Sequence, residues 1–297
     1  TTLRAARSRQ RLLERKYWGC DMTRLSGDYS EGLTAASLSG LLELETTLRS
    51  YRDSIVLVGG WVPYMLIKEY GRGDFRHVGS IDIDLAVDPE GVDVDAYASV
   101  VELIEGRGWK TKGERIPNSF VKNISSPLDG KDYEIKVDFL TSPTPDKHRH
   151  RKVQPDLPAR KAVGCGLAFR HHVDLALKGN LPGDGEALAN VRMLDIPGCI
   201  GMKGIVLGER YVEKDAYDIF SVVSQCLEGP AAVAGVVLAR MGDAEMAQGI
   251  GVIRRNFESI RSSGPSWVAN FVGGDEETRK RQQAEAYALV SEFLAAL

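Results

Sequence analysis

The stretch Ser80-Ile81-Asp82-Ile83-Asp84-Leu85-Ala86-Val87 decides how the chain is interpreted, because polar and apolar residues alternate along most of it. This alternation is typical of a β-strand with one buried face, so both aspartates leave one face and the isoleucines the other. Two carboxylates held this close repel each other, and one is driven toward protonation unless a cation lies between them. A divalent ion removes that cost, and hard oxygen ligands favour Mg²⁺ or Mn²⁺. Taken alone, the pair is equally compatible with two solvated aspartates on an edge strand.

A second short strand is expected upstream, where Ile55-Val56-Leu57-Val58 ends at Gly59-Gly60. Residues 61–70 then have the pattern of a helix packed on that strand. Backbone N–H groups of Gly59 and Gly60 and the amino end of this helix would therefore face a phosphate. Ser80 leaves the same strand face as Asp82 and adds a hydroxyl group there.

The segment Glu134-Ile135-Lys136-Val137-Asp138 repeats the alternation and places its three charged side chains on one face. If Asp138 lies on a strand next to Asp82 and Asp84, the three carboxylates complete a site for two metal ions. Two such ions would hold a triphosphate, offset the charge of the transition state and orient an attacking hydroxyl group.

Together, these features resemble the DNA polymerase β-type nucleotidyltransferase superfamily: Gly-Gly, then Ser-x-Asp-x-Asp on a strand, then a third Asp on a later strand. The chain departs from the compact members because Gly60 and Asp82 are farther apart, with residues 68–78 as an apparent insertion.

A narrower resemblance lies in Lys203-Gly-Ile-Val-Leu-Gly-Glu-Arg210, followed by Lys214-Asp-Ala-Tyr-Asp218. This is similar to a motif of the AbiEii-like (MenT-like) nucleotidyltransferases, the toxins of type IV toxin–antitoxin systems. In that family a Lys and an Arg seven residues apart precede a basic residue, an Asp and a second Asp three further on. On a continuous helix Lys203, Arg210 and Lys214 would share one cationic face, and the alternative is a solvated helix with ordinary ion pairs.

The resemblance implies transfer of a nucleoside monophosphate from an NTP, with release of pyrophosphate. In several relatives the acceptor is the 3′ end of tRNA, which blocks charging and inhibits translation, and a cognate antitoxin protein is a possible partner. By position, Asp82 and Asp84 resemble metal ligands for Mg²⁺ or Mn²⁺, and Asp138 the third ligand or the base for the acceptor hydroxyl. Asp215 would orient Lys203 or act in proton transfer, and the sequence leaves this open. The implied nucleotide-binding residues are Gly59, Gly60, Ser80, Lys203, Arg210, Lys214 and Asp218.

A basic stretch, Lys147-His148-Arg149-His150-Arg151-Lys152, lies between the third aspartate and the helical motif. It is either a solvated loop or a patch that contacts the backbone of an RNA acceptor, in which case binding should weaken with salt. The residues that would make this contact are Lys147, Arg149, Arg151 and Lys152.

Composition narrows the class of protein. The chain has 297 residues, a formal net charge of −3, 43% hydrophobic and 27% charged residues, which fits a globular protein and excludes a uniformly basic nucleic-acid coat. The cysteines are scattered without a CxxC pair, as expected of reduced thiols. No apolar run approaches the roughly 20 residues of a membrane span, and no secretory signal is visible. We therefore expect a soluble cytoplasmic protein with no membrane partner.

The predicted fold class is α/β (α+β), with a mixed sheet followed by helices. We expect a basic arm or helix at 1–32, a nucleotidyltransferase domain at 33–198 and a helical domain at 199–297 that carries the Lys203/Asp215 motif. Further elements are expected as helices at 33–51 and 94–106, and as strands at 109–115, 119–124 and 133–140, the last two forming a hairpin. Gly-Pro and Gly-Gly breaks divide the end of the chain into about four helices.

Two other functions remain open. A nucleotidyltransferase could act on a small molecule such as an antibiotic, although the basic stretch and the sizeable helical domain favour a large polyanionic acceptor. A non-catalytic nucleotide-binding regulator is disfavoured because Asp82, Asp84 and Asp138 are all intact.

Overall fold

The structure, a computed structural model, describes residues 24–92, 98–183 and 185–297. The helices before the last strand are η1 (Ser26–Asp28), α2 (Glu31–Thr47), η2 (Arg49–Tyr51), α3 (Trp61–Tyr70), α4 (Val100–Glu105) and α5 (Cys165–Arg170). The strands are β1 (Ile55–Val58), β2 (Asp82–Val87), β3 (Lys110–Thr111), β4 (Ser119–Ser125), β5 (Asp132–Thr141), β6 (His150–Lys152), β7 (Pro158–Lys161), β8 (His172–Asn180) and β9 (Glu186–Leu194). The remaining helices are α6 (Ile196–Arg210), α7 (Glu213–Gln225), α8 (Pro230–Leu238), α9 (Ala244–Asn256), α10 (Ser263–Val272) and α11 (Glu276–Ala295).

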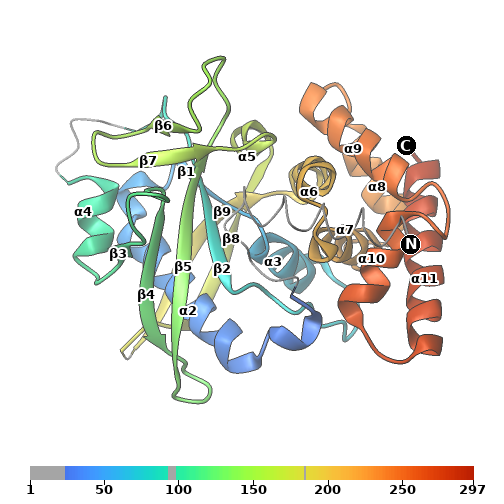
Figure 1. The fold of residues 1–297 in the computed structure, drawn as a ribbon, viewed down its shortest axis with the longest axis horizontal. Coiled ribbons are helices and arrows are strands. Elements are labelled where there is room, and N and C mark those ends of the chain that lie inside the picture. Colours follow the sequence, from blue (N-terminus) through green and yellow to red (C-terminus); the bar gives the residue numbers. More distant parts are fainter. Residues whose placement is uncertain (1–23, 93–97, 184) are drawn as a thin grey trace, which may run out of the picture.

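Within the described residues, the strands form one mixed nine-stranded sheet in the order β3-β4-β5-β2-β1-β9-β8, with β7 added to β5 and β6 to β7. Neighbours β2 and β5 are parallel, whereas β1 and β2, and also β4 and β5, are antiparallel. Figure 1 shows α2 and α4 on the sheet side of the molecule and α8 to α11 gathered at the other end. The predicted fold class, a mixed sheet followed by C-terminal helices, is confirmed.

The predicted alternation of β2 is confirmed by its burial. Ile83 and Leu85 are 0% and 1% exposed and belong to the core under α2, whereas Asp82 and Asp84 are on the opposite face. Helix α2 is capped by Ser30, whose side chain accepts a hydrogen bond from the backbone N–H of Leu33. This helix covers the apolar face and leaves the aspartate face for the site.

Several predicted elements have different bounds. The predicted helix at 33–51 divides into α2 and η2. Of the predicted helix at 94–106, residues 93–97 lie outside the described residues, and α4 begins only after Ser99, whose side chain caps it by accepting a hydrogen bond from the Glu102 N–H. The predicted strand at 109–115 is reduced to β3, because the chain turns at Gly113 with φ of 125°. The hairpin of β4 and β5 is confirmed, with Ser119 opposite Asp138.

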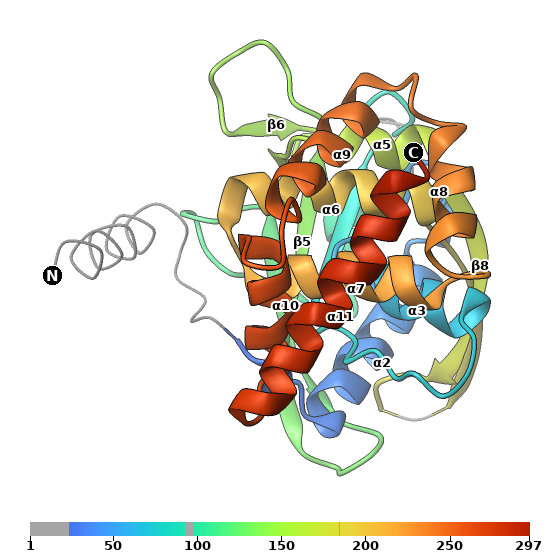
Figure 2. The ribbon, with the colours of Figure 1, turned by 90° about the vertical axis from the view of Figure 1, so that its right-hand side faces the viewer.

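The sheet also contains strands that the prediction does not include. The β8–β9 hairpin adds two strands beyond β1, and the parallel pair of β1 and β9 brings the chain directly to the start of α6. The helical part is more divided than predicted, with α6 to α11 in place of about four helices. In Figure 2, α11 crosses the outer surface of this part and α7 lies behind it.

Three of the four cysteines lie in the part of the chain that the structure describes. Cys165, Cys199 and Cys226 are buried free thiols, and Cys20 lies outside the described residues. Most of the basic arm predicted at 1–32 also lies outside the described residues, which begin at Arg24. Within the described ranges, no helix combines the length and the apolar composition that crossing a bilayer requires.

Candidate active site

The three predicted carboxylates lie on two neighbouring strands. Because β2 and β5 are parallel neighbours, Asp84 faces Asp138 in register and Asp82 faces Lys136. The predicted adjacency of Asp138 to the other two aspartates is therefore confirmed. The side chain of Ser119 on β4 donates a short hydrogen bond to Asp138, so a third strand holds this carboxylate from the other side.

A lysine ammonium lies among the carboxylates. The Nζ atom of Lys136 is 3.1 Å from Oδ2 of Asp138 and 3.8 Å from Oδ2 of Asp82. Burial opposes the charge of Lys136, but the aspartates outweigh it and hold the pKa of the ammonium above its usual range. Burial and the neighbouring Asp138 raise the pKa of Asp84. Sequence reasoning placed Lys136 on this face but gave it no role.

The chemistry of this cluster fits a divalent cation. Its ligand atoms would be hard carboxylate oxygens, and the ammonium of Lys136 already lies between those of Asp82 and Asp138. In the part of the chain that the structure describes, no group of three or more His, Cys, Asp or Glu residues is disposed to hold a metal ion as it stands. The carboxylates are arranged around Lys136 instead.

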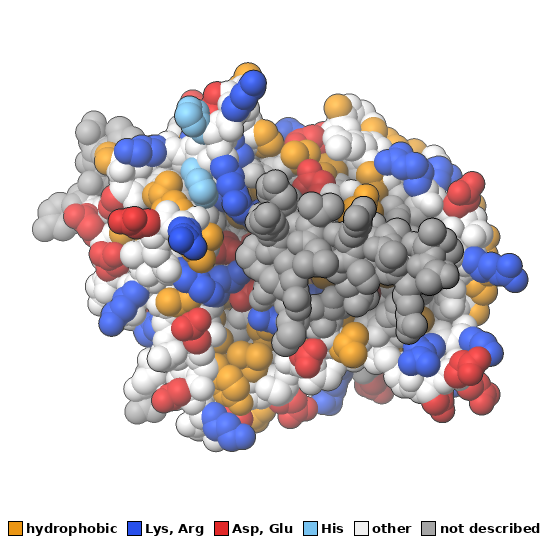
Figure 3. Space-filling view, in the orientation of Figure 1, with side chains coloured by type: hydrophobic (Ala, Val, Ile, Leu, Met, Phe, Trp, Pro, Cys, Tyr) orange, Lys and Arg blue, Asp and Glu red, His pale blue; other side chains and the backbone are white. Residues whose placement is uncertain are grey.

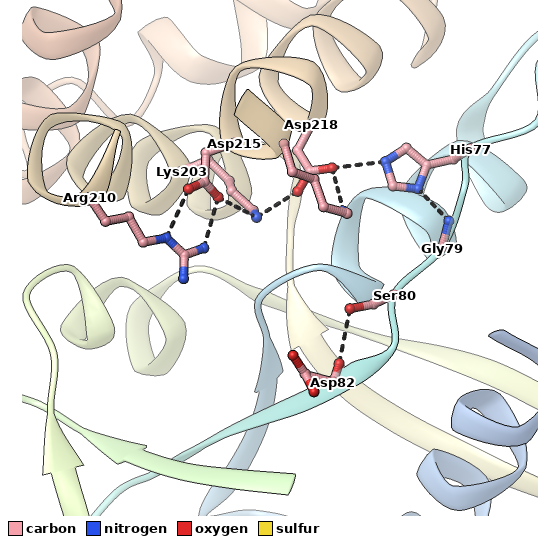
Figure 4. Close-up of polar contacts among 9 residues, drawn as sticks. His77, Gly79, Ser80, Asp82, Lys203, Arg210, Asp215 and Asp218 are labelled. Carbon is pink, nitrogen blue, oxygen red and sulfur yellow. Dashed lines mark hydrogen bonds and ion pairs between the residues drawn. The ribbon is translucent and has the colours of Figure 1, made fainter. Parts of the chain in front are cut away.

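The Gly59-Gly60 turn lies directly against these groups. Gly59 has a φ of 75°, which favours glycine, and a Cβ atom there would collide with the carboxylate of Asp84. A Cβ atom on Gly60 would lie 2.6 Å from Oγ of Ser80 and 3.3 Å from Nζ of Lys214. The Ser80 hydroxyl donates to the backbone carbonyl of Asp82 at 2.9 Å (Figure 4). A carboxylate, a hydroxyl and an ammonium group thus meet at the turn that opens α3.

The helical motif forms an ion-pair cluster across from Ser80 and Asp82, in which Arg210 is exposed and the other members are buried (Figure 4). Nζ of Lys203 lies 2.9 Å from Oδ1 of Asp215 and 2.6 Å from Oδ2 of Asp218. Arg210 donates through Nε and Nη2 to both oxygens of Asp215, at 2.9 and 3.0 Å. Lys214 donates to Asp218 at 2.8 Å. Three cationic side chains therefore share two carboxylates, which leaves the cluster one positive charge in excess.

This cluster does not lie on one continuous helix, which was the condition for placing Lys203, Arg210 and Lys214 on a single face. Helix α6 ends at Arg210, Tyr211 adopts a left-handed conformation with φ of 51°, and α7 begins at Glu213. The condition for one cationic helix face, a continuous helix from Lys203 to Lys214, is therefore not met. The turn at Tyr211 reverses the chain, so that Asp215 and Asp218 of α7 face Lys203 of α6.

Burial makes the charges in this cluster depend on one another. Asp215 and Asp218 are 0% exposed, and although burial opposes their ionisation, the nearby cations hold the pKa of both below the usual range. The pKa of Lys203 is raised against the effect of burial by the same two carboxylates. Burial, with the neighbouring ammonium of Lys203, lowers the pKa of Lys214. Lys214 is thus the cation whose charge is least well compensated, and its Nζ is the one beside Gly60.

A histidine that sequence reasoning missed also reaches this cluster. Nδ1 of His77 accepts a hydrogen bond from the Gly79 backbone N–H at 3.1 Å, so Nε2 carries the proton and donates to Oδ1 of Asp218 at 3.0 Å. The ring stacks on Tyr217 with centroids 5.1 Å apart. Burial lowers the pKa of His77 to about 4, although the bond to Asp218 acts in the other direction. His77 lies in the apparent insertion, which gave no sequence signal.

The described part of the amino-terminal region lies at the same site. Arg24 Nη1 is 3.5 Å from Oδ2 of Asp82. The ammonium of Lys214 is 5.5 Å from the ring centroid of Tyr29, which also contacts Phe271 edge to face. Burial and the charge of Asp218 raise the pKa of the Tyr29 phenol. Neither residue had a spacing in the sequence that linked it to the aspartates.

The basic stretch is close to the carboxylate strands, though its members differ in their contacts. Nε2 of His150 on β6 lies 3.2 Å from Oδ1 of Asn118, the residue before Ser119. Arg151 pairs with Glu90 at 2.9 Å, whereas the exposed residues of the stretch include Lys147, Arg149 and Lys152. In Figure 3, His, Lys and Arg side chains gather over β6 and the loop before it.

Comparisons with known proteins give two structural similarities. No protein-family model and no curated protein matches the chain. An antigenic nucleotidyltransferase-like protein from Paracoccidioides brasiliensis is similar with a TM-score of 0.43 and 13% identity, over 78% of this chain and 93% of that one. JHP933 from Helicobacter pylori is similar with a TM-score of 0.38 and 10% identity, over 89% of this chain and 94% of that one.

Proposed function

We propose that this chain is a metal-dependent nucleotidyltransferase that transfers a nucleoside monophosphate from an NTP to an RNA hydroxyl group. The observation that carries the proposal is the convergence of three separate parts at one place. The in-register pair Asp84 and Asp138, the Gly59-Gly60 turn and the positively charged α6–α7 cluster all meet there. Carboxylates and cations gathered around a glycine turn are what binding and activating a triphosphate requires.

The triphosphate would lie between the glycine turn and the helical cluster. Backbone N–H groups at Gly60 and the amino end of α3 would donate to a phosphate there, since no side-chain hydrogen bond caps that helix. Lys214 is next to the turn and would contact the phosphates directly. Lys203 is 6% exposed and pairs with Asp215 and Asp218. It would therefore hold Asp215 and Lys214 in position rather than contact the phosphates itself. Asp218 acts in the same way, through the two lysines.

The reaction would form a bond between the acceptor hydroxyl oxygen and the α-phosphorus. The bond from that phosphorus to the bridging oxygen breaks, pyrophosphate leaves, and the hydroxyl proton passes to a base. Asp138 suits the role of base, because its side chain is 14% exposed and lies on the site face of β5. Asp215 does not suit it, because it is enclosed and held ionised by Arg210 and Lys203. We therefore assign Asp215 an orienting role.

A Mg²⁺ or Mn²⁺ ion would be held by Asp82, Asp84 and Asp138. When bound, such an ion supplies positive charge that screens the carboxylates from the triphosphate and stabilises charge on the transferred phosphoryl group. The remaining contributions come from the chain itself, through the glycine turn, Ser80 and the α6–α7 cations.

The proposed acceptor is the 3′ end of tRNA. The support is the basic stretch beside Asn118 and Ser119, which would place a polyanion next to Asp138. The resemblance of the α6–α7 motif to the AbiEii-like toxins favours the same acceptor, inhibition of translation and a cognate antitoxin as partner.

The test is transfer of label from each α-labelled NTP to total tRNA in the presence of Mg²⁺. We expect labelled tRNA with the natural protein and at least about 100-fold less with Asp138→Asn. Asp132→Asn is the matched control, since Asp132 is an exposed aspartate at the start of the same strand. Label in small molecules alone would refute the RNA acceptor, and no label with any acceptor would refute the enzymatic function.

A further inference from the structure

We propose that Lys136 is a resident counter-cation of the carboxylate cluster, and that a divalent metal ion binds there in competition with its ammonium group. The inference deepens the proposed function and rests on the assignment of Asp82, Asp84 and Asp138 as the metal site. It concerns how this site is regulated when no metal ion is bound.

The position of Lys136 follows from strand geometry. It is two residues before Asp138 on β5, so both side chains leave the same face, and it is the register partner of Asp82 on β2. Its ammonium lies 3.1 Å from Asp138 and 3.8 Å from Asp82 and therefore bridges the two strands. A cation that bridges two carboxylates occupies the kind of position that a metal ion would take.

The electrostatics show why the site needs such a cation. Three carboxylates on two adjacent strands repel one another, because Asp84 and Asp138 are register partners and Asp82 lies two residues before Asp84 on the same face of β2. Lys136 offsets part of this repulsion, and Arg24 adds a weaker contact to Asp82 at 3.5 Å. The side chain of Lys136 is 23% exposed, which leaves its flexible stem room to move when a competing ion enters.

Competition has a measurable consequence. A metal ion that enters the natural site must replace the contacts of Lys136 with Asp138 and Asp82. If the ammonium is removed and the stem is kept, the carboxylates lose that compensation and bind the ion more tightly. Lys136→Met should therefore increase metal affinity, which is the opposite of what the loss of a simple structural residue would do.

The experiment measures Mn²⁺ binding to the full chain without nucleotide, from the electron paramagnetic resonance signal of free Mn²⁺ at low ionic strength. We expect Lys136→Met to lower the dissociation constant at least tenfold and Lys136→Arg to leave it within about threefold. Lys178→Met is the control, because Lys178 is also an ion-paired lysine on a strand, with Glu186 at 2.9 Å, but lies on β8. Unchanged or weaker binding by Lys136→Met, or no binding by any variant, would overturn the inference.

A second measurement uses the natural protein and does not depend on a variant folding. Brief acetylation followed by mass spectrometry should show Lys136 modified at least threefold faster with saturating Mn²⁺ than without it, since the ion releases the ammonium from its carboxylates. Equal or slower modification would contradict displacement. If Lys136→Met binds Mn²⁺ with unchanged affinity while the natural protein transfers nucleotide, only this inference is overturned. If Lys136→Met binds Mn²⁺ more tightly but the natural protein transfers no nucleotide, only the proposed reaction is overturned.

Discussion

Replacing Asp218 with asparagine removes the carboxylate that two buried lysines and a histidine share. Asp218 is 0% exposed and lies 2.6 Å from Lys203, 2.8 Å from Lys214 and 3.0 Å from His77. Asparagine keeps the shape and one hydrogen-bond acceptor but carries no charge. Lys203 retains Asp215, whereas the ion pair between Lys214 and Asp218 is lost, so a buried ammonium is left without compensation.

Removing one partner of a buried ion pair costs about 3–5 kcal/mol, because the other charge remains buried. Lys214 is 8% exposed, so little of this cost is recovered from water. We therefore expect Asp218→Asn to lower the free energy of unfolding by about 3 kcal/mol.

Urea denaturation at pH 7 measures this change, and a double-mutant cycle tests its cause. Lys214→Met in the Asp218→Asn background removes the uncompensated charge, so about half of the lost stability should return. A loss below about 1 kcal/mol, or no recovery in the double variant, would refute the assignment of Lys214 as the cation that depends on Asp218.

Three further predictions concern the carboxylates, the histidine and the basic stretch. Asp84→Asn should reduce nucleotide transfer at least about 100-fold. It should not lower the melting temperature at pH 7, because a raised pKa means that the ionised carboxyl is disfavoured in the folded state; a large loss of stability would show a structural role. Because of His77, the free energy of unfolding should fall as the pH is lowered from about 6.5 to about 4. In this range the histidine is protonated in the unfolded chain but not in the folded one. Unfolding free energies at several pH values should lose this slope in His77→Gln but keep it in His148→Gln, and an unchanged slope in both would contradict the burial argument. Lys147→Ala combined with Arg149→Ala should weaken tRNA binding and make the slope of log affinity against log salt shallower by about 2, as measured by filter binding; an unchanged slope would exclude these residues from the phosphate contacts.

The carboxylate strands could be predicted because alternation records which face a side chain takes. Asp82, Asp84 and Asp138 followed from two segments of alternating sequence, and the structure pairs Asp84 with Asp138 in register. Strand β8 is absent from the expected elements, although its apolar residues Val173, Leu175 and Leu177 alternate in the same way and were sufficient to predict it. That omission lay in the interpretation, since the periodicity was there.

Other parts of the site have no one-dimensional signal. The left-handed turn at Tyr211 reverses the chain between Lys203 and Asp218, and a non-glycine residue in this conformation is not predicted by helical periodicity. Tyr29 and His77 reach the cluster through tertiary contacts, from segments without a motif. The role of Lys136 depends on the register of two strands, which residue spacing alone does not fix.

Residues 70–79, which connect α3 to β2, form hydrogen bonds with α7 and the residues just after it. At one end, backbone hydrogen bonds join Tyr70 to Leu227 and Arg72 to Gln225, and at the other His77 holds Asp218. Ser80 and Asp82 follow directly, so the segment that leads into β2 is bound to α7 and the residues just after it at both ends. Under the proposed function, a conformational change that admits a bulky acceptor would therefore have to occur outside residues 70–79, because both ends of this segment are held by hydrogen bonds.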